Sequence, residues 1–182
     1  MDIAQIQNEH LVWATRNFPT DVGVAYRSLL GVVEEFGELV GALGEGNAVE
    51  TQDAIADMTI FMLGYCSAKK WALQTLVRAI TFRELQDSLV SLEASVTSEV
   101  LLLALARFVG KLCHAQLKSE QRIRLGAIQN DGSGMIAVIR IVNHLCLLCG
   151  RLGLDYEESV LGVWKAVSAR DWISFPENGL SA

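Results

Sequence analysis

The chain has 182 residues, of which 51% are hydrophobic and 20% are charged, and its formal net charge is −6. This length suits one domain with a substantial core, and the hydrophobic content argues against intrinsic disorder. The acidic balance and the lack of a dense Lys/Arg run disfavour nucleic acid as a partner.

The N-terminus and the apolar segments predict neither export nor membrane insertion. The first residues, MDIAQIQNEH, lack the basic and apolar regions of a secretory signal. The richest uncharged stretch, MTIFMLGYCSA, ends at Lys69 and falls short of the roughly 18 to 20 residues that span a bilayer. We therefore expect no membrane partner and a cytoplasmic location.

The hydrophobic periodicity predicts an all-α protein. Pro19 and Pro176 are the two prolines and lie near the chain ends, so nothing interrupts a long helical interior. Helices are expected at approximately 3–18, 24–43, 49–70, 73–85, 97–120, 135–152 and 155–172. The glycines of GEGN suit a cap after the second helix, and Asp155 suits the N-cap of the last. The stretch QNDGSG, residues 129–134, is predicted to be a turn.

All four cysteines fall within apolar helical patterns: Cys66, Cys113, Cys146 and Cys149. Because no export signal is evident, we expect reduced, buried thiols. Cys146 and Cys149 form a C-x-x-C pair close to His144, but a zinc site needs four ligands and no second pair stands at ligand spacing. Core packing is the favoured interpretation and zinc the alternative.

The segment GVVEEFGELVGALGEG concentrates Glu34, Glu35 and Glu38, whose like charges repel at this helical spacing. The next expected helix carries Asp53 and Asp57, four positions apart on one face. If the two helices pack antiparallel, the carboxylates converge, and their repulsion and desolvation demand a compensating cation. The cluster therefore predicts a Mg²⁺ site, with Mn²⁺ as an alternative ion. A solvated acidic helix face is the other interpretation.

These acidic segments resemble the hallmark of the MazG-like all-α NTP pyrophosphatases, a superfamily that also holds dimeric dUTPases and phosphoribosyl-ATP pyrophosphohydrolases. The hallmark is E-E-x-x-E on one helix followed by E-x-x-D or D-x-x-x-D on the next. The chain has EEFGE from Glu34 to Glu38 and DAIAD from Asp53 to Asp57. The segments WATRNFP and VWKAVSARDW are also similar to parts of that superfamily. The E-x-x-D glutamate would fall at Ala54, so the chain matches only the D-x-x-x-D variant.

The resemblance implies hydrolysis of a nucleoside triphosphate to the monophosphate and pyrophosphate, with non-canonical or dUTP-like nucleotides as substrates. Four carboxylates would hold magnesium: Glu35, Glu38, Asp53 and Asp57. Glu34 would orient or deprotonate the attacking water, and Lys165 and Arg170 would bind substrate phosphates. Trp13 and Asn17 are candidates for base recognition. The other function we weigh is a catalytically silent helical protein that binds a nucleotide or a partner.

The second half of the chain repeats the helical plan with inverted charge. A slide of 73 positions (110 minus 37) sets Gly110 against Gly37 and pairs Glu34, Glu35 and Glu38 with Arg107, Phe108 and Lys111. A slide of 83 sets Arg140 against Asp57 (140 minus 57). A chance match of two helical hairpins is the alternative.

We therefore expect one domain, 1–182, built of two tandem, related hairpin units. The metal-binding repeat covers 1–85, and the degenerate repeat covers 86–182 with the C-terminal helix. In the degenerate repeat, Lys111 and Arg140 would face substrate phosphates or replace metal ions by ion pairs. Fused units would supply internally the contacts of a dimer, although a homodimer is the alternative.

Overall fold

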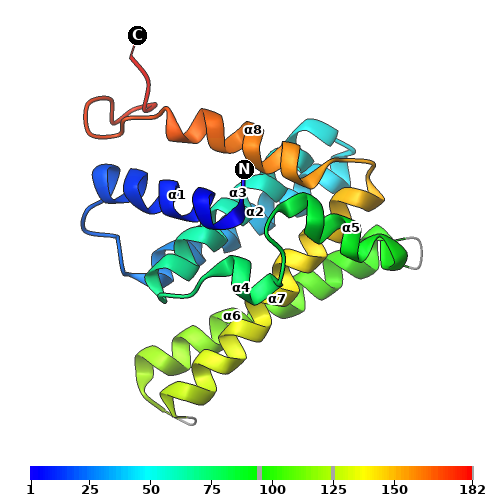
Figure 1. Ribbon diagram of the computed structural model, residues 1–182, viewed down its shortest axis with the longest axis horizontal. Helices are drawn as coiled ribbons and strands as arrows, with labels where there is room; N and C mark the ends of the chain where they lie inside the picture. Colours follow the sequence, from blue (N-terminus) through cyan, green and yellow to red (C-terminus); the bar gives the residue numbers. More distant parts are fainter. Residues whose placement is uncertain (94–95, 124–125, 182) are drawn as a thin grey trace.

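A computed structural model of the protein describes residues 1–93, 96–123 and 126–181. Across these residues it contains eight helices and no strand, which confirms an all-α fold (Figure 1). In chain order the helices are α1 (Ile3–Asn17), α2 (Ala25–Glu45), α3 (Ala48–Ala68), α4 (Leu73–Val77), α5 (Phe82–Glu93), α6 (Ser98–Gln121), α7 (Ala127–Arg151) and α8 (Tyr156–Ser168).

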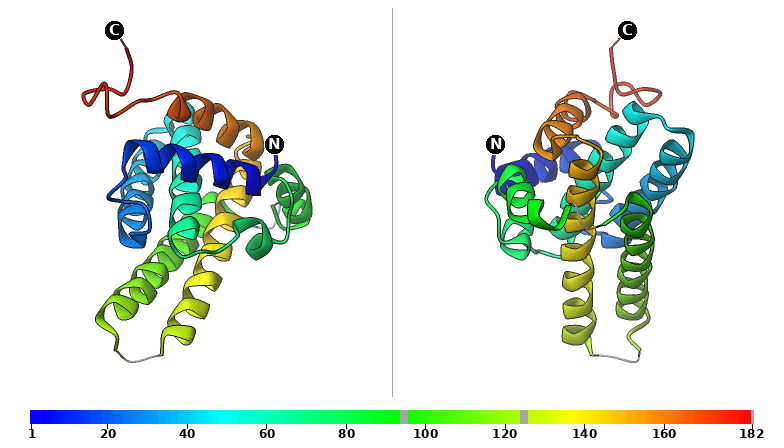
Figure 2. Two further views of the ribbon diagram at one scale, coloured as in Figure 1. Left: turned by 60° about the vertical axis from the view of Figure 1, so that its left-hand side comes forward. Right: turned by 90° about the vertical axis from the view of Figure 1, so that its right-hand side faces the viewer.

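Two helical hairpins form the centre of the fold. Helix α2 pairs with α3 and α6 pairs with α7, and the hairpins meet where α3 contacts α7 and α2 contacts α6. Helices α1 and α8 pack on α3, whereas α4 and α5 pack on α7. Figure 2 shows the ends of α6 and α7 projecting beyond the other helices, with the C-terminus at the opposite end of the molecule.

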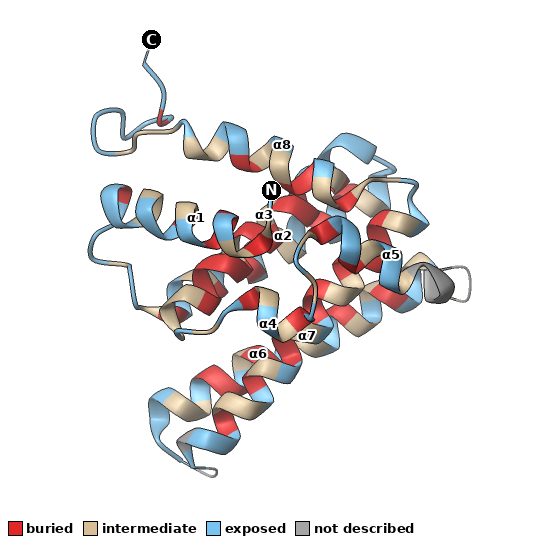
Figure 3. Cartoon of the chain, in the orientation of Figure 1, coloured by how far each residue is buried: buried red, intermediate tan, exposed pale blue. Residues whose placement is uncertain are grey.

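Helix α3 is buried along most of its length, and Figure 3 shows buried residues concentrated where the helices meet. A helix that is apolar nearly all round belongs in the interior. Its buried hydroxyls are bonded: Thr59 lies 2.8 Å from the Tyr156 hydroxyl, and Tyr65 donates to Gln116 Oε1 at 3.0 Å. Helix α3 therefore carries Asp57, from the middle of the helix, into a region of low solvent access.

Two helix ends follow the predicted caps. Gly46 ends α2 in the left-handed conformation, with φ of 69°, and its N–H donates back into the helix. The Asp155 carboxylate precedes α8 and accepts a hydrogen bond from the Glu158 N–H at 2.9 Å. Helix α8 ends at Ser168, earlier than the predicted end at Trp172.

The single helix expected over 73–85 is wrong, because two helices stand there. After the short α4, Arg78 takes a left-handed conformation with φ of 58°, and Thr81 then caps α5. The break lets the fully buried Phe82 pack against Tyr156, with ring centroids 5.1 Å apart. Burial of this large ring outweighs helix continuity.

The turn expected at 129–134 is also wrong, because these residues lie within α7. Gly134 lies so close to the Trp71 ring that a Cβ there would be 3.1 Å from Cη2. The Asp131 carboxylate pairs with Lys69, with 2.6 Å between Oδ1 and Nζ. Both contacts join α7 to the segment after α3, so tertiary packing keeps a stretch of turn-like composition helical.

The part of the chain that the structure describes contains two helices long and apolar enough to cross a membrane, Ser98–Gln121 and Ile128–Arg151. Charged residues such as Lys111 and Arg140 interrupt them, so no uninterrupted apolar stretch revealed them in the sequence. Within their apolar windows, 33% of the first and 56% of the second are buried inside the protein. Core helices meet the same criterion of length and composition, so the absence of a membrane partner stays a prediction.

The four cysteines are free thiols. Cys66, Cys146 and Cys149 are buried as the pattern predicts, whereas Cys113 is half-buried. Burial raises the pKa of the Cys66 and Cys149 thiols to about 12. These two sulfurs are therefore protonated packing groups at neutral pH.

Candidate functional site

A cavity of about 370 Å³ opens among α1, the α1–α2 loop, α2, α3 and the segment after α8. Its ring-bearing wall residues are His10, Trp13, Phe18, Phe61 and Trp172. Charged and hydroxyl side chains also line it: Asp21, Arg27, Ser28, Glu35, Asp57, Ser67 and Arg170. The cavity thus combines flat apolar surfaces with carboxylates and guanidinium groups, the composition of many small-molecule sites.

Glu35 is the carboxylate of α2 that faces this cavity, and it is half-buried. Burial, followed by the repulsion of neighbouring carboxylates, raises its pKa to about 8. The neighbours that act on it are Asp57, Glu38, Glu34 and Asp53. The two predicted acidic segments therefore share one electrostatic neighbourhood.

Asp57 reaches the cavity from α3, the central helix. Burial and the nearby Asp53 raise its pKa to about 6, although the Arg170 guanidinium acts in the opposite direction. Arg170, which follows α8, thus lies close enough to interact with Asp57. A carboxylate pair beside an arginine is an arrangement that can hold both a cation and a phosphate group.

Three of the predicted acids, Glu34, Glu38 and Asp53, are exposed and lie outside the cavity wall. Among the described residues, no three His, Cys, Asp or Glu side chains are grouped tightly enough to hold a metal ion as they stand. The donor set itself, carboxylate oxygens that raise one another's pKa, suits a hard divalent cation. Asp53 and Glu38 lie close enough to Asp57 for their charges to raise its pKa.

Trp13 and Asn17 of α1 differ in their access to the cavity. Trp13 lines it and donates from Nε1 to the Arg170 carbonyl at 3.0 Å. Asn17 is buried outside the lining: its amide nitrogen donates to the Trp13 carbonyl, and its oxygen accepts from the Trp172 N–H at 2.8 Å. Asn17 therefore ties the segment after α8 to α1, next to the cavity.

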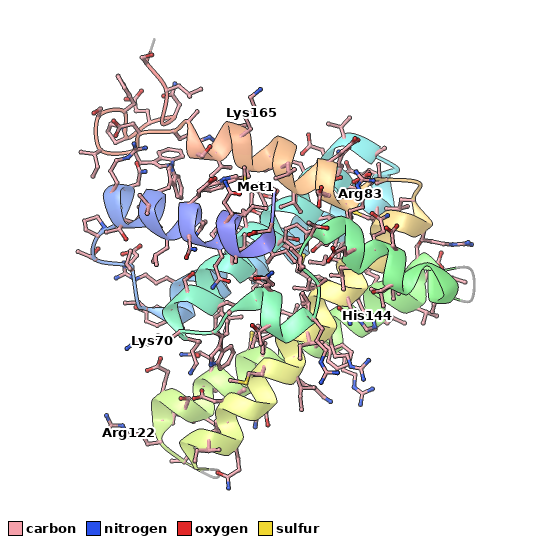
Figure 4. The ribbon with its side chains drawn as sticks, in the orientation of Figure 1. Met1, Lys70, Arg83, Arg122, His144 and Lys165 are labelled. Carbon is pink, nitrogen blue, oxygen red and sulfur yellow. The ribbon has the colours of Figure 1, made fainter. Side chains whose placement is uncertain are left out.

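The remaining predicted cations lie away from the cavity. Lys165 is exposed and points outward from α8 (Figure 4). Lys111 on α6 and Arg140 on α7 are exposed and belong to the opposite hairpin. Among the predicted basic residues, the structure brings only Arg170 to the carboxylates.

His10 is a cavity residue that the sequence motifs did not single out. Its ring lies 5.9 Å from the Trp13 ring and 5.7 Å from the Trp164 ring, and burial lowers its pKa to about 4. Its Nδ1 atom has no hydrogen-bond partner among the described residues. The apolar stripe of α1 places His10 on the buried face, but only the tertiary structure places it beside a cavity.

Gly64 leaves room for the His10 ring beside α3. A Cβ on Gly64 would stand 2.9 Å from both His10 Cε1 and Ser28 Oγ, closer than side chains tolerate. Gly31 plays the same part for Phe61, whose ring would meet a Cβ at 2.4 Å. The two glycines allow rings to approach the helix backbones of α2 and α3.

Comparison with known proteins finds no matching protein family, no matching curated protein and no matching solved structure. The arguments for function therefore come from the site itself.

Proposed function

We propose that the protein is a magnesium-dependent nucleoside triphosphate pyrophosphohydrolase that releases a nucleoside monophosphate and pyrophosphate. Non-canonical or dUTP-like nucleotides are the proposed substrate class, and the cytoplasm is the proposed location. One observation carries the proposal: half-buried Glu35 and Asp57, from adjacent helices, line a cavity together with Arg170 and several aromatic rings. Such a lining combines charged groups for a triphosphate with aromatic rings for a base.

The carboxylates of α2 and α3 would hold the metal and the water. Glu35, Glu38, Asp53 and Asp57 supply only hard oxygen ligands, which magnesium prefers. When held by these carboxylates, magnesium would supply positive charge for the phosphates and a more acidic water molecule. Glu34 lies in the same electrostatic neighbourhood and would orient or deprotonate that water.

The rest of the cavity would hold the nucleotide. The Arg170 guanidinium would bind phosphate oxygens through charge-assisted hydrogen bonds. Trp13 and Phe61 offer ring surfaces to a planar base. His10 is neutral at physiological pH and would add a ring nitrogen that hydrogen-bonds to the base edge.

We also propose that the chain consists of two related units, α1–α4 and α5–α8. Gln7 on α1 accepts a hydrogen bond from the Leu73 N–H at 3.0 Å, and Gln86 on α5 accepts one from the Tyr156 N–H at 2.9 Å. The Gln7 amide also donates to the Trp71 carbonyl at 2.7 Å, and the Gln86 amide donates to the Leu154 carbonyl at 3.0 Å. Each of these carbonyls lies two positions before the N–H that the same glutamine accepts from. The same clamp therefore joins the first and fourth helices of both units.

The ends of α3 and α7 support the same duplication. Lys70 and Gly153 both take positive φ values, of 58° and 73°. The next residues, Trp71 and Leu154, donate their N–H groups to the carbonyls of Cys66 and Cys149, at 2.8 and 2.9 Å. Helix packing is reciprocal as well, because α8 packs on α3 and α4 packs on α7. We therefore propose a boundary between the two units in the turn 78–81, whereas the sequence pattern predicts it at 85.

A screen for pyrophosphate release tests the proposed activity. Standard and modified nucleoside triphosphates are incubated with wild-type protein, with and without Mg²⁺ or Mn²⁺. Glu38→Gln should reduce metal-dependent release by roughly 100-fold, because it removes one charged oxygen ligand of the proposed magnesium ion. Glu45→Gln, on an exposed glutamate of the same helix, is the matched control. Equal turnover by wild type and Glu38→Gln would overturn the catalytic assignment.

The second candidate is a catalytically silent protein that binds a nucleotide or a partner. It is favoured by the aromatic walls and His10, which would hold a planar ligand without any help from the acids. Calorimetric titration with a nonhydrolysable nucleotide, with and without Mg²⁺, separates the two. Binding that needs no metal, with no pyrophosphate release from any nucleotide, identifies the silent protein.

A further inference from the structure

Five side chains gather on the outer surface of the α6–α7 hairpin, far along the chain from the cavity. This Phe108 cluster comprises Arg107, Phe108, Lys111, Arg140 and His144. The Lys111 ammonium lies 5.4 Å and the Arg107 guanidinium 5.9 Å from the centre of the Phe108 ring. The His144 ring lies 5.4 Å from the same ring, and its Nδ1 is 2.6 Å from the Arg140 backbone carbonyl oxygen. Burial and then the nearby Arg140 charge lower the pKa of His144. Figure 4 labels His144 on α7.

The cations of the Phe108 cluster have no carboxylate partner among the described residues. The ion pairs found among the described residues use other cations: Arg27, Lys69 and Arg83. Arg107, Lys111 and Arg140 are all exposed. Three positive charges thus stand together on a protein whose net charge is −6.

Their positions correspond to those of the acidic cluster on the other hairpin. Under the slide between α2 and α6, buried Leu39 matches buried Leu112, and exposed Gly37 matches exposed Gly110. Lys111 then stands at the position of Glu38. The α2–α3 framework brings carboxylates close enough to raise the pKa of Glu35, and the α6–α7 framework brings cations together in the same way. One hairpin concentrates negative charge and the other positive charge.

We propose that the Phe108 cluster binds short polyphosphate chains, whether inorganic or carried by a nucleotide. Guanidinium groups bind phosphate oxygens through paired hydrogen bonds, and lysine adds a compact charge. The Phe108 and His144 rings are half-buried against each other, so the exposed groups of the cluster are its three cations. The cluster therefore recognises the phosphates and ignores the base. The correspondence between the two clusters rests on the proposed duplication, whereas binding at the Phe108 cluster does not require hydrolysis.

Calorimetric titration with inorganic tripolyphosphate tests the proposal, in EDTA and at low ionic strength. Without divalent ions the acidic cluster repels the polyanion, and no turnover occurs. Lys111→Gln/Arg140→Gln should weaken binding by at least tenfold. The control Lys118→Gln/Arg122→Gln removes the same charge from the far end of α6 and should change binding by less than twofold. Circular dichroism checks that both variants keep the wild-type helix content.

Several results would overturn the proposal. No binding by wild type would mean that the Phe108 cluster is not a polyphosphate site. Equal weakening in both double variants would mean that general surface charge binds the polyanion. A nonhydrolysable nucleoside triphosphate that binds more than tenfold tighter than tripolyphosphate, with the difference lost in Lys111→Gln/Arg140→Gln, would mean that the cluster reads the base. Because the assay contains no metal, its outcome is independent of whether the protein hydrolyses nucleotides.

Discussion

At the scale of single residues, Glu35 shows the cost of gathering carboxylates in a partly buried site. Its pKa is raised from 4.5 to about 8, so the folded protein binds a proton that the unfolded chain has already released at neutral pH. The stabilisation from this proton is complete below about pH 4.5. It is lost as the pH rises through 8, and a divalent cation would replace the proton there.

The variant Glu35→Gln should therefore stabilise the metal-free protein at high pH. Because about half of the side chain remains open to solvent, we expect a gain of about 1 to 2 kcal/mol at pH 8 and almost none at pH 4.5. Thermal unfolding followed by circular dichroism in EDTA measures the difference. A wild type that is more stable than the variant at pH 8 would show that the ionised Glu35 carboxylate does not destabilise the folded protein.

Divalent ions should act in the opposite direction on the wild type. Added Mn²⁺ or Mg²⁺ should raise Tm at pH 8 by several degrees and by less at pH 6, because Glu35 still holds its proton at the lower pH. The same titration on Glu35→Gln should give a much smaller rise. An equal rise in both proteins would place the ion elsewhere.

At the scale of elements, side chains in contact across helices decide where a helix begins, ends and approaches its neighbour. Phe82 starts a new helix because its ring is buried against Tyr156. Gly134 stays helical in α7 because the Trp71 ring lies over it. Gly64 similarly leaves room for a ring beside α3. At each of these positions packing overrides local preference.

Two helical glycines give a matched test of this packing. Gly64→Ala should destabilise the protein by about 1 to 3 kcal/mol, because its Cβ would overlap the buried His10 ring and Ser28. Gly41→Ala has no atom within 4 Å of the new Cβ and should stabilise α2 by about 0.5 to 1 kcal/mol. Urea unfolding compares the two. Stabilisation by Gly64→Ala would contradict the close approach of His10 to α3.

At the scale of the whole molecule, two hairpins of similar design differ in what they leave exposed. The α2–α3 hairpin borders the cavity and is covered by α1 and α8. The α6–α7 hairpin extends past the other helices and carries the Phe108 cluster (Figure 2). The proposed duplication would keep one helical framework while the two copies carry opposite charge.

The glutamine clamps test whether the two units are built alike. Gln7→Ala and Gln86→Ala should each cost about 1 to 3 kcal/mol, because each leaves a helix-starting N–H and a carbonyl without a partner. The more exposed Gln86 belongs at the lower end of this range. Gln5→Ala, on an exposed residue of α1, should change stability by less than about 0.5 kcal/mol.

Urea unfolding measures all three variants and the Gln7→Ala/Gln86→Ala pair. Costs that add within about 0.5 kcal/mol would indicate two separate, equivalent clamps. A loss at Gln7 with none at Gln86 would contradict the equivalence.

The sequence by itself determined the helical class, the cap at Gly46, the N-cap at Asp155 and the spacing that puts Glu35 and Glu38 on one helix face. Each of these depends on residues within about four positions of one another, a range that helical periodicity and capping rules cover. The tertiary structure alone decided the break before Phe82 and the place of His10 beside the cavity. These depend on contacts between distant positions, such as the Gln7–Leu73 hydrogen bond across 66 positions, which no local pattern encodes.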